Sequence, residues 1–180
     1  MNYCVLDLEA TCFENNKDHQ MEIIEIGAVI VDENWNEISE FNSLVCPLVN
    51  PMLSEFCTQL THITQSDVDN ADTFPKVIER FKEWVEDNGG KGSMIFCSWG
   101  KYDYNQLKSD CNLHQLEFPF QDIHINLKNV VATYSHSKRK GVVPALNQFG
   151  LTFEGTHHRG LDDTKNILRI CRASGLNLNS

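Results

Sequence analysis

The sequence predicts an α/β fold in which a meander of strands precedes alternating helices and strands. Three apolar segments come first, at 3–11, 21–31 and 38–45, and the polar residues at 32–36 separate the second from the third as a turn does. Strand, turn and strand at this spacing predict an antiparallel meander. Helix-periodic segments and one further apolar strand follow. We expect one domain, residues 1–180, because a chain of this length can bury a substantial core.

The helices and the fourth strand are predicted from capping residues and apolar stripes. Thr73 with Pro75 begins a helix whose stripe ends at 88–90, in the sequence Asn-Gly-Gly. Residues 64–67 have capping-box spacing, with Asp in place of Glu or Gln. The other predicted elements are a short helix at 54–60, a strand at 93–98, a helix after Asp103, a helix with the stripe Leu127, Val130, Val131 and Tyr134, a short helix from Pro144 to Gly150, and a last helix from Leu161 to Ala173.

The first predicted strand carries two carboxylates within an apolar run. In a strand, residues i and i+2 point to the same face, so Asp7 and Glu9 project side by side with Cα atoms about 6–7 Å apart. Two anions in an apolar strand need a partner, and no Lys or Arg lies nearby in the sequence. Oxygen ligands of this kind suit a divalent metal. The alternative is a strand end at which both carboxylates reach water.

Three more carboxylates and one histidine lie at informative positions. Asp103 follows a strand and opens a helix, where open α/β sheets place their sites and where helices also take acidic residues. Asp163 lies on the apolar face of the last helix, and His158 precedes it in a loop. A carboxylate on an apolar face again needs a partner. Glu25 interrupts the second apolar run, where we expect a structural carboxylate at the sheet edge.

Composition limits the classes of partner and compartment. The net charge of −10 argues against a broad basic face for duplex nucleic acid, but it allows a narrow cleft in which bound metals supply positive charge. Seven cysteines without CxxC spacing indicate reduced intracellular thiols, so we expect a cytoplasmic protein. A core strand that starts near residue 3 predicts no signal peptide, and no apolar run is long enough to span a membrane.

The carboxylates and the histidine form an ordered series along the chain. Asp-x-Glu lies on the first strand, a single Asp follows a later strand, and His-x4-Asp leads into the last helix. The series resembles the DEDDh 3′–5′ exonucleases: residues 7–11 resemble the first motif of that family, Asp103 the second, and residues 158–163 the third. The resemblance implies a ribonuclease-H-like fold, with a central mixed five-stranded sheet that begins with an antiparallel meander and is flanked by helices.

The resemblance is more specific to one branch of the family. This branch is the histone-mRNA 3′-exonuclease and enhancer-of-RNAi group, whose bacterial relatives are labelled inhibitors of a sporulation kinase pathway. The segments that carry the resemblance are 7–12, 24–26, 60–65, 71–75 and 160–167. Eukaryotic members have a separate nucleic-acid-binding domain before the nuclease, whereas we expect none in this chain. Tyr102 stands where the histone-mRNA enzyme has tryptophan.

The resemblance implies hydrolysis of phosphodiester bonds with two divalent metal ions, Mg²⁺ or Mn²⁺. The implied metal ligands are Asp7, Glu9, Asp103 and Asp163. Asp7 would bridge the two ions. His158 suits a general base, because a histidine titrates near neutral pH and can accept a proton from water. His157 is adjacent, but the five-residue spacing to the last Asp favours His158.

The resemblance also implies contacts with the 3′ end of a single-stranded nucleic acid, and RNA is the substrate that we expect first. Backbone groups of Ala10 and Thr11 would approach the terminal sugar, and Ile63 would pack against the last base. Trp99 and Tyr102 are candidates for stacking on unpaired bases.

The sequence contains one basic cluster, Lys138-Arg139-Lys140, within residues 135–141. Taken alone, it is typical of a solvated loop. The resemblance implies that these side chains contact phosphates upstream of the 3′ end. Because so small a basic surface can neutralise few duplex phosphates, we expect a preference for single-stranded 3′ ends.

Three functional hypotheses follow from the sequence. The first is a 3′–5′ exoribonuclease, the second is a 3′–5′ DNA exonuclease, and the third is a regulatory nucleic-acid-binding protein that keeps the fold without catalysis. The 2′-hydroxyl of the substrate discriminates the first two. Loss of a metal ligand or of the base would favour the third, and the sequence retains all five residues.

Overall fold

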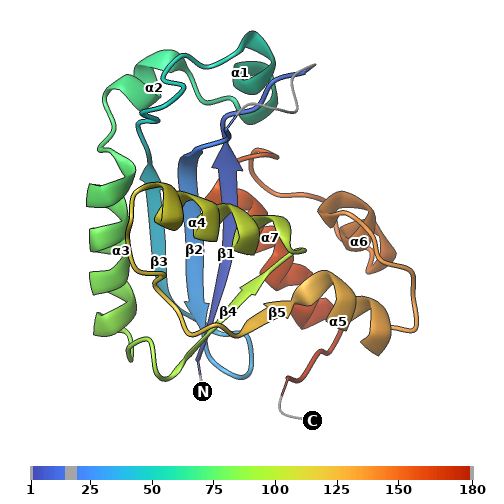
Figure 1. Cartoon of the computed structure of the whole chain (residues 1–180). Coiled ribbons are helices and arrows are strands. Elements are labelled where there is room, and N and C mark those ends of the chain that lie inside the picture. Colours follow the sequence, from blue (N-terminus) through green and yellow to red (C-terminus); the bar gives the residue numbers. More distant parts are fainter. Residues whose placement is uncertain (1, 15–19, 179–180) are drawn as a thin grey trace.

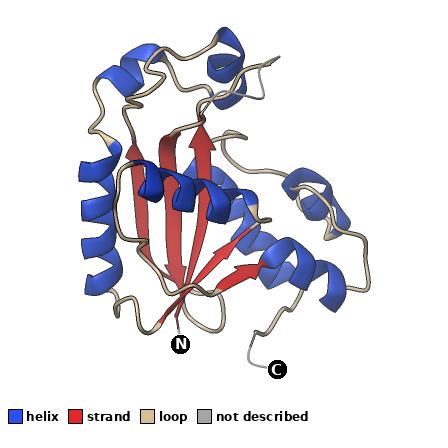
Figure 2. Ribbon diagram, viewed as in Figure 1, coloured by secondary structure: helices blue, strands red, loops and turns tan. Residues whose placement is uncertain are grey.

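A computed structural model describes residues 2–14 and 20–178, whose strands and helices are shown in Figures 1 and 2. In chain order they are β1 (Asn2–Ala10), β2 (Ile23–Val31), β3 (Glu37–Leu44), α1 (Glu55–Thr61), α2 (Gln65–Asp69), α3 (Phe74–Asp87), β4 (Met94–Ser98), α4 (Tyr102–Leu113), β5 (His124–Asn126), α5 (Leu127–Tyr134), α6 (Val142–Gln148) and α7 (Gly160–Ala173). None of these helices is long and apolar enough to cross a membrane.

The strands form one mixed sheet in the order β3-β2-β1-β4-β5. β1 pairs with β2, and β2 with β3, in antiparallel orientation, whereas β4 is parallel to β1 and β5 is parallel to β4. The antiparallel meander and the five-stranded mixed sheet are therefore confirmed. β1 lies at the centre of the sheet, with α4 in front of it and α7 behind it in the view of Figure 1.

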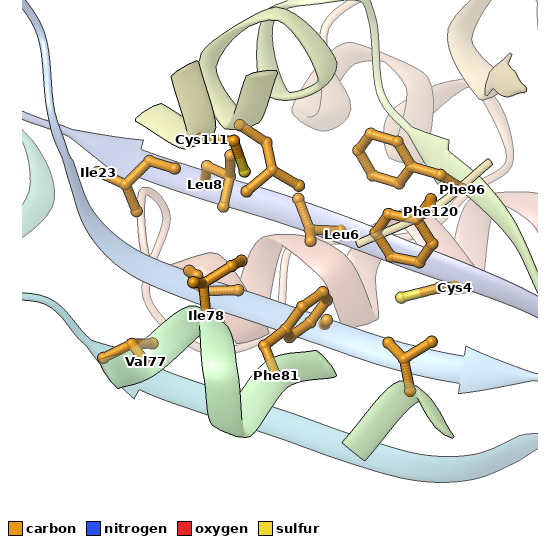
Figure 3. Close-up of a cluster of buried hydrophobic side chains, with 14 of the residues drawn as sticks. Cys4, Leu6, Leu8, Ile23, Val77, Ile78, Phe81, Phe96, Cys111 and Phe120 are labelled. Carbon is orange, nitrogen blue, oxygen red and sulfur yellow. The ribbon is translucent and has the colours of Figure 1, made fainter. Parts of the chain in front are cut away.

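Alternate residues of β1 belong to two different cores. Cys4, Leu6 and Leu8 point to the face covered by α3 and α4, and Figure 3 shows them packed against side chains of both helices. Tyr3 and Val5 point to the opposite face, where α5, α6 and α7 pack. Successive side chains of a strand alternate between faces, so the two carboxylates of β1 share the face of α7.

Helix α7 packs directly on the sheet backbone at two glycines. A Cβ atom on Gly27 would lie 2.0 Å from the carbonyl carbon of Gly160, and one on Gly160 would lie 3.0 Å from the carbonyl oxygen of Asp7. The Thr164 hydroxyl donates a hydrogen bond of 3.0 Å to the carbonyl oxygen of Gly27. This contact places the first turn of α7, which carries Asp163, against the second half of β1.

Gly27→Ala is expected to destabilise the protein by about 1–3 kcal/mol or more, because the added methyl group meets backbone that cannot move aside. Urea unfolding followed by circular dichroism measures the effect. Gly92→Ala is the matched control, since a Cβ there would meet nothing within 4 Å. Equal stability of the two variants would contradict the proposed close approach.

Four details of the sequence predictions are corrected by the structure. Strand β5 was not predicted from its residues, because three residues are too few to show alternation. Tyr134 is 48% exposed, so it is not part of the α5 stripe that packs on the core. Helix α6 starts at Val142 and ends at Gln148, so Pro144 lies within its first turn, where no partner for a proline N–H is needed. Glu25 lies on β2, an interior strand, and not at a sheet edge.

Candidate active site

The carboxyl end of β1 extends past its neighbour β4. The two strands pair through Asn2–Val5 of β1, which then continues to Ala10 while β4 leads into α4. Asp103, in the first turn of α4, accepts the backbone N–H of Leu8 at 3.2 Å through its Oδ1 atom. The Asp103 carboxylate thus accepts a backbone N–H of β1 that lies beyond the segment paired with β4. Open α/β sheets place their sites at such strand ends.

Three carboxylates converge at this end of β1. One oxygen atom from each of Asp7, Glu9 and Asp163 lies within 4.8 Å of the others. The first two come from one face of β1, as the spacing predicted, and the third comes from α7. Asp103 lines the same cleft from the side of α4. Among the described residues, no lysine or arginine forms an ion pair with any of the four; the basic groups within 4.0 Å are histidines.

Burial raises the pKa values of these carboxyl groups, and repulsion within the cluster adds to the rise for Asp7 and Glu9. Burial is the main cause for Glu9, with Asp163 as the strongest charged neighbour, and the pKa of Glu9 is raised to about 8. Burial, then the charges of Asp103 and Asp163, raise the pKa of Asp7 well above its usual value. Burial raises the pKa of Asp103 and of Asp163 to about 6. Clustered oxygen ligands without a protein cation are the donor set that divalent metals bind.

Two adjacent histidines face the carboxylates. Nδ1 of His158 lies 3.9 Å from Oε1 of Glu9, and Nε2 of His157 lies 3.5 Å from Oδ1 of Asp163. The two rings have centroids 4.0 Å apart. His158 has a left-handed φ of 63°, and its backbone N–H donates to Oδ2 of Asp163 at 2.7 Å. Burial, then the charges of His157 and His62, lower the pKa of His158, so its neutral form predominates at pH 7.

A buried ion pair holds the loop that carries these histidines. Glu25 of β2 lies directly opposite Glu9 of β1 and is fully buried. Arg159 donates to the Glu25 carboxylate from Nη2 at 2.9 Å and from Nε at 3.1 Å, and the N–H of Gly160 adds a bond of 2.9 Å. Arg159 therefore neutralises one glutamate of the facing pair. Sequence reasoning missed this pairing, although an acidic residue inside an apolar strand was a signal that a cation was needed.

The structure brings two of the predicted base-contacting residues to the cleft. Trp99 and Tyr102 line this cleft, which has a volume of about 250 Å³. Tyr102 is 47% exposed, whereas Trp99 is 8% exposed and donates its indole N–H to the carbonyl oxygen of Lys140 at 3.0 Å. Ile63 is not brought to the cleft: it is 1% exposed and packs in a small core cluster with Ile24, Cys57 and Val68.

The remaining predicted contact residues lie on either side of the cleft. Ala10 and Thr11 are buried at the end of β1, and the N–H of Thr11 already donates to the carbonyl oxygen of Glu22 at 2.8 Å. Lys138 and Arg139 are exposed and line a separate hollow of about 700 Å³ beside α5. The bond from Trp99 to Lys140 connects this basic loop to the wall of the cleft.

Comparison with known proteins shows the family. The family model described as exonuclease, or RNase T, matches residues 4–171. This chain belongs to the exonuclease family. The 3′-5′ exoribonuclease 1 of Rattus norvegicus is 37% identical over 175 residues, which cover 93% of this chain and 51% of the relative. The human ERI1 exoribonuclease 2 is 32% identical over 90% of this chain and 26% of its own length. The chain thus spans about half the length, or less, of these curated relatives.

Solved structures of exonucleases have the same fold. The nuclease domain of 3′hExo, described as a DEDDh family member bound to rAMP, is 34% identical with a TM-score of 0.88, over 95% of this chain and 90% of that one. A structure described as 3′-end specific recognition of a histone mRNA stem-loop by 3′-exonuclease is 32% identical with a TM-score of 0.88, over 95% and 62%. The predicted resemblance to DEDDh exonucleases and to the histone-mRNA branch is confirmed, as is the ribonuclease-H-like fold.

DEDDh exonucleases depend on divalent metals. The acidic cluster of this chain therefore predicts how its stability depends on pH and on bound metal. Without metal, we expect its stability to fall as the pH rises from about 5 to about 8. Folded carboxyl groups with raised pKa values keep protons that the unfolded chain releases near pH 4, so folding becomes less favourable as pH rises through the folded pKa values of about 6 and 8.

A bound cation offsets the loss of stability that ionisation of these carboxyl groups causes. Mn²⁺ or Mg²⁺ should therefore raise the melting temperature more at pH 8 than at pH 5. Thermal unfolding with excess EDTA and with millimolar metal measures both curves. A metal-free melting temperature that rises steadily across this window would contradict the assignment of the repulsion to these carboxyl groups.

Proposed function

We propose that this chain is a metal-dependent 3′–5′ exoribonuclease that removes nucleotides from single-stranded 3′ ends and releases nucleoside 5′-monophosphates. The observation that carries the proposal is the convergence of Asp7, Glu9 and Asp163, with His158 beside them and Asp103 across the same cleft. The similarity to proteins named 3′-5′ exoribonucleases supports it. We infer that residues 1–180 form one exonuclease domain.

The four carboxylates would hold two divalent ions, Mg²⁺ or Mn²⁺. Asp7 suits the bridging position, because its charged neighbours include Asp103 as well as Asp163 and Glu9. When bound, the ions neutralise charge on the phosphate and on the leaving oxygen and make water more acidic. His158 accepts the proton of the attacking water on its neutral imidazole. The bond from phosphorus to the 3′ oxygen of the upstream nucleotide breaks, which leaves the phosphate on the released nucleotide.

Tyr102 and Trp99 would orient the substrate at the cleft. The half-exposed ring of Tyr102 offers a face on which an unpaired base can stack, and such stacking does not depend on sequence. A cleft of about 250 Å³ accepts one terminal nucleotide at a time and favours a frayed or single-stranded end over a paired one. Ala10 and Thr11 would approach the terminal sugar, and contact with Ile63 would require its cluster to open.

The lysines and arginines without an ion-pair partner suggest where the upstream part of a bound nucleic-acid strand would run. Within the described ranges, eight lysines and arginines are ion-paired within 4.0 Å, namely Lys76, Arg80, Lys91, Lys108, Arg159, Lys165, Arg169 and Arg172. The others in the described ranges are Lys82, Lys101, Lys128, Lys138, Arg139 and Lys140. All of these except Lys82 belong to segments beside the cleft or to the basic loop joined to it by Trp99. Positive charges left unpaired on one side of an acidic protein suit the phosphates of a bound strand.

Replacing both Lys138 and Arg139 with glutamine is expected to raise KM for a single-stranded RNA severalfold and to leave kcat within about twofold. The slope of log KM against log salt should decrease by roughly one to two, because two phosphate contacts are lost. Lys82→Gln is the matched control, since it removes an unpaired cation on α3. Equal effects of the control and the double variant would exclude a local path for the phosphates.

Turnover of matched RNA and DNA oligonucleotides tests the proposed substrate class. We expect faster degradation of RNA, because the cleft would contact the terminal sugar, where RNA and DNA differ. Faster DNA turnover would favour the DNA exonuclease, and tight binding without turnover in saturating metal would favour the regulatory binding protein. A cytoplasmic location is part of the proposal and rests on the seven cysteines, all of them free thiols.

A further inference from the structure

Two cysteines distant in sequence meet where the chain leaves β1. Cys12 lies two residues beyond the end of β1 and is half-buried, and Cys57 of α1 is fully buried. Cys12 packs against the cluster that contains Cys57, and the Cys12 thiol lowers the pKa of Cys57. The thiol of Cys57 also donates to the carbonyl oxygen of Ala10 at 3.7 Å.

The backbone holds the two cysteines together independently of their thiols. The hydroxyl of Ser54 donates to the carbonyl oxygen of Cys12 at 2.6 Å and accepts the backbone N–H of Cys57 at 3.0 Å as the N-cap of α1. A single side chain therefore contacts both residues. This arrangement holds the backbones of the two residues close to each other, as a disulfide between them requires.

We propose that Cys12 and Cys57 form an oxidisable dithiol that closes into an intramolecular disulfide and fastens the end of β1 to helix α1. The proposal goes beyond the nuclease activity and does not depend on it. Among the seven cysteines, Cys12 combines partial exposure with a neighbouring thiol. Cys46 is half-buried, but its thiol donates to the backbone of Pro47. The remaining cysteines, Cys4, Cys97, Cys111 and Cys171, are buried in the two main cores.

A hydroperoxide is the oxidant class that fits this pair. The Cys12 sulfur attacks the outer peroxide oxygen, the oxygen–oxygen bond breaks, and the thiol proton of Cys12 passes to the leaving oxygen, which departs as water or an alcohol. The sulfenic acid formed on Cys12 is then attacked by the Cys57 sulfur, which displaces water and closes the disulfide. Two thiols lose two electrons in total, and the peroxide gains them. Contact with Cys57 raises the pKa of Cys12, whereas contact with Cys12 lowers the pKa of Cys57 to about 7, so Cys57 more readily forms the thiolate that attacks the sulfenic acid near neutral pH.

Treatment of the folded protein with hydrogen peroxide, followed by alkylation, proteolysis and mass spectrometry, tests the proposal. We expect a Cys12–Cys57 linked peptide and the loss of two of the seven thiols, both reversed by dithiothreitol. The melting temperature should rise by a few degrees on oxidation, because the bond closes a long loop in the unfolded chain. Neither change should occur in Cys12→Ser, a substitution at a half-buried position that the fold can accept.

Cys46→Ser is the matched control and should form the linked peptide as the unmodified protein does. The Cys57→Ser variant should also fail to form it, but the interpretation does not depend on that variant because Cys57 is buried. Oxidation of Cys12 to a sulfinic acid without a linked peptide would overturn the proposal. A linked peptide that joins any other pair, or a melting temperature that falls when the bond forms, would also overturn it.

Discussion

Asp7→Asn is expected to abolish two-site metal binding and to lower kcat for RNA by about three orders of magnitude or more. Asp7 lies beside Glu9 on one face of β1, one of its oxygen atoms lies within 4.8 Å of both Glu9 and Asp163, and the charge of Asp103 also acts on it. An amide keeps the shape of the side chain but removes the negative charge that would be shared between two cations. Several kcal/mol of charge stabilisation at the phosphate depend on those cations, and each 1.36 kcal/mol is about a factor of ten in rate.

Calorimetric titration with Mn²⁺ and single-turnover kinetics measure the two effects. Asp110→Asn is the matched control, because burial also raises the pKa of Asp110 to about 6 but its carboxylate bonds to Ile23 and Gln106 outside the cleft. The control should bind metal and hydrolyse RNA normally. Asp7→Asn with two intact Mn²⁺ sites would rule out the bridging role.

His158→Ala is expected to lower kcat by about 10²–10⁴, the usual range for loss of a general base, while metal affinity stays within a few-fold. The carboxylates that would hold the ions are unchanged by the substitution. The unmodified protein should lose activity as the pH falls through the lowered pKa of His158, because protonation removes the acceptor for the proton of water. The variant should not show this loss at low pH. A pH–rate profile in saturating metal measures both quantities.

His157→Ala separates the two histidines, whose rings lie 4.0 Å apart in the same cleft. We expect it to keep turnover within about tenfold, because the ring of His157 lies nearest to Asp163 and the ring of His158 nearest to Glu9. Near-normal turnover of His158→Ala together with loss of turnover in His157→Ala would assign the base to the other ring.

Local periodicity was enough to predict the acidic side of the site. The alternation of a strand places Asp7 and Glu9 on one face, and the helical repeat of the last helix places Asp163 on its buried face; both placements are found in the structure. The capping box at Thr64, with Asp67 as its third residue, was likewise predicted and is present. Each of these features depends on residues within one element, so the sequence contains the information directly.

Contacts between distant segments could not be predicted in the same way. Arg159 and Glu25 are 134 residues apart, and neither local sequence indicates that the other residue is its partner. The contact of Gly27 with Gly160 depends on how closely α7 approaches the sheet, which is a tertiary property. The orientation of His158 depends on a left-handed φ in a loop, a conformation that histidine adopts uncommonly. Sequence spacing and the family resemblance therefore predicted the residues of the candidate site but not the ion pair that holds its histidine loop.

The most direct test of the proposed activity is degradation of one single-stranded RNA labelled at its 3′ end or at its 5′ end, with Mg²⁺ and with EDTA. With Mg²⁺, the 3′ label should appear at once as a mononucleotide, while the 5′ label stays on fragments that shorten one nucleotide at a time. With EDTA, both labels should remain on intact RNA. Release of the 5′ label first, internal cleavage, or degradation that EDTA does not stop would contradict a metal-dependent 3′–5′ exoribonuclease.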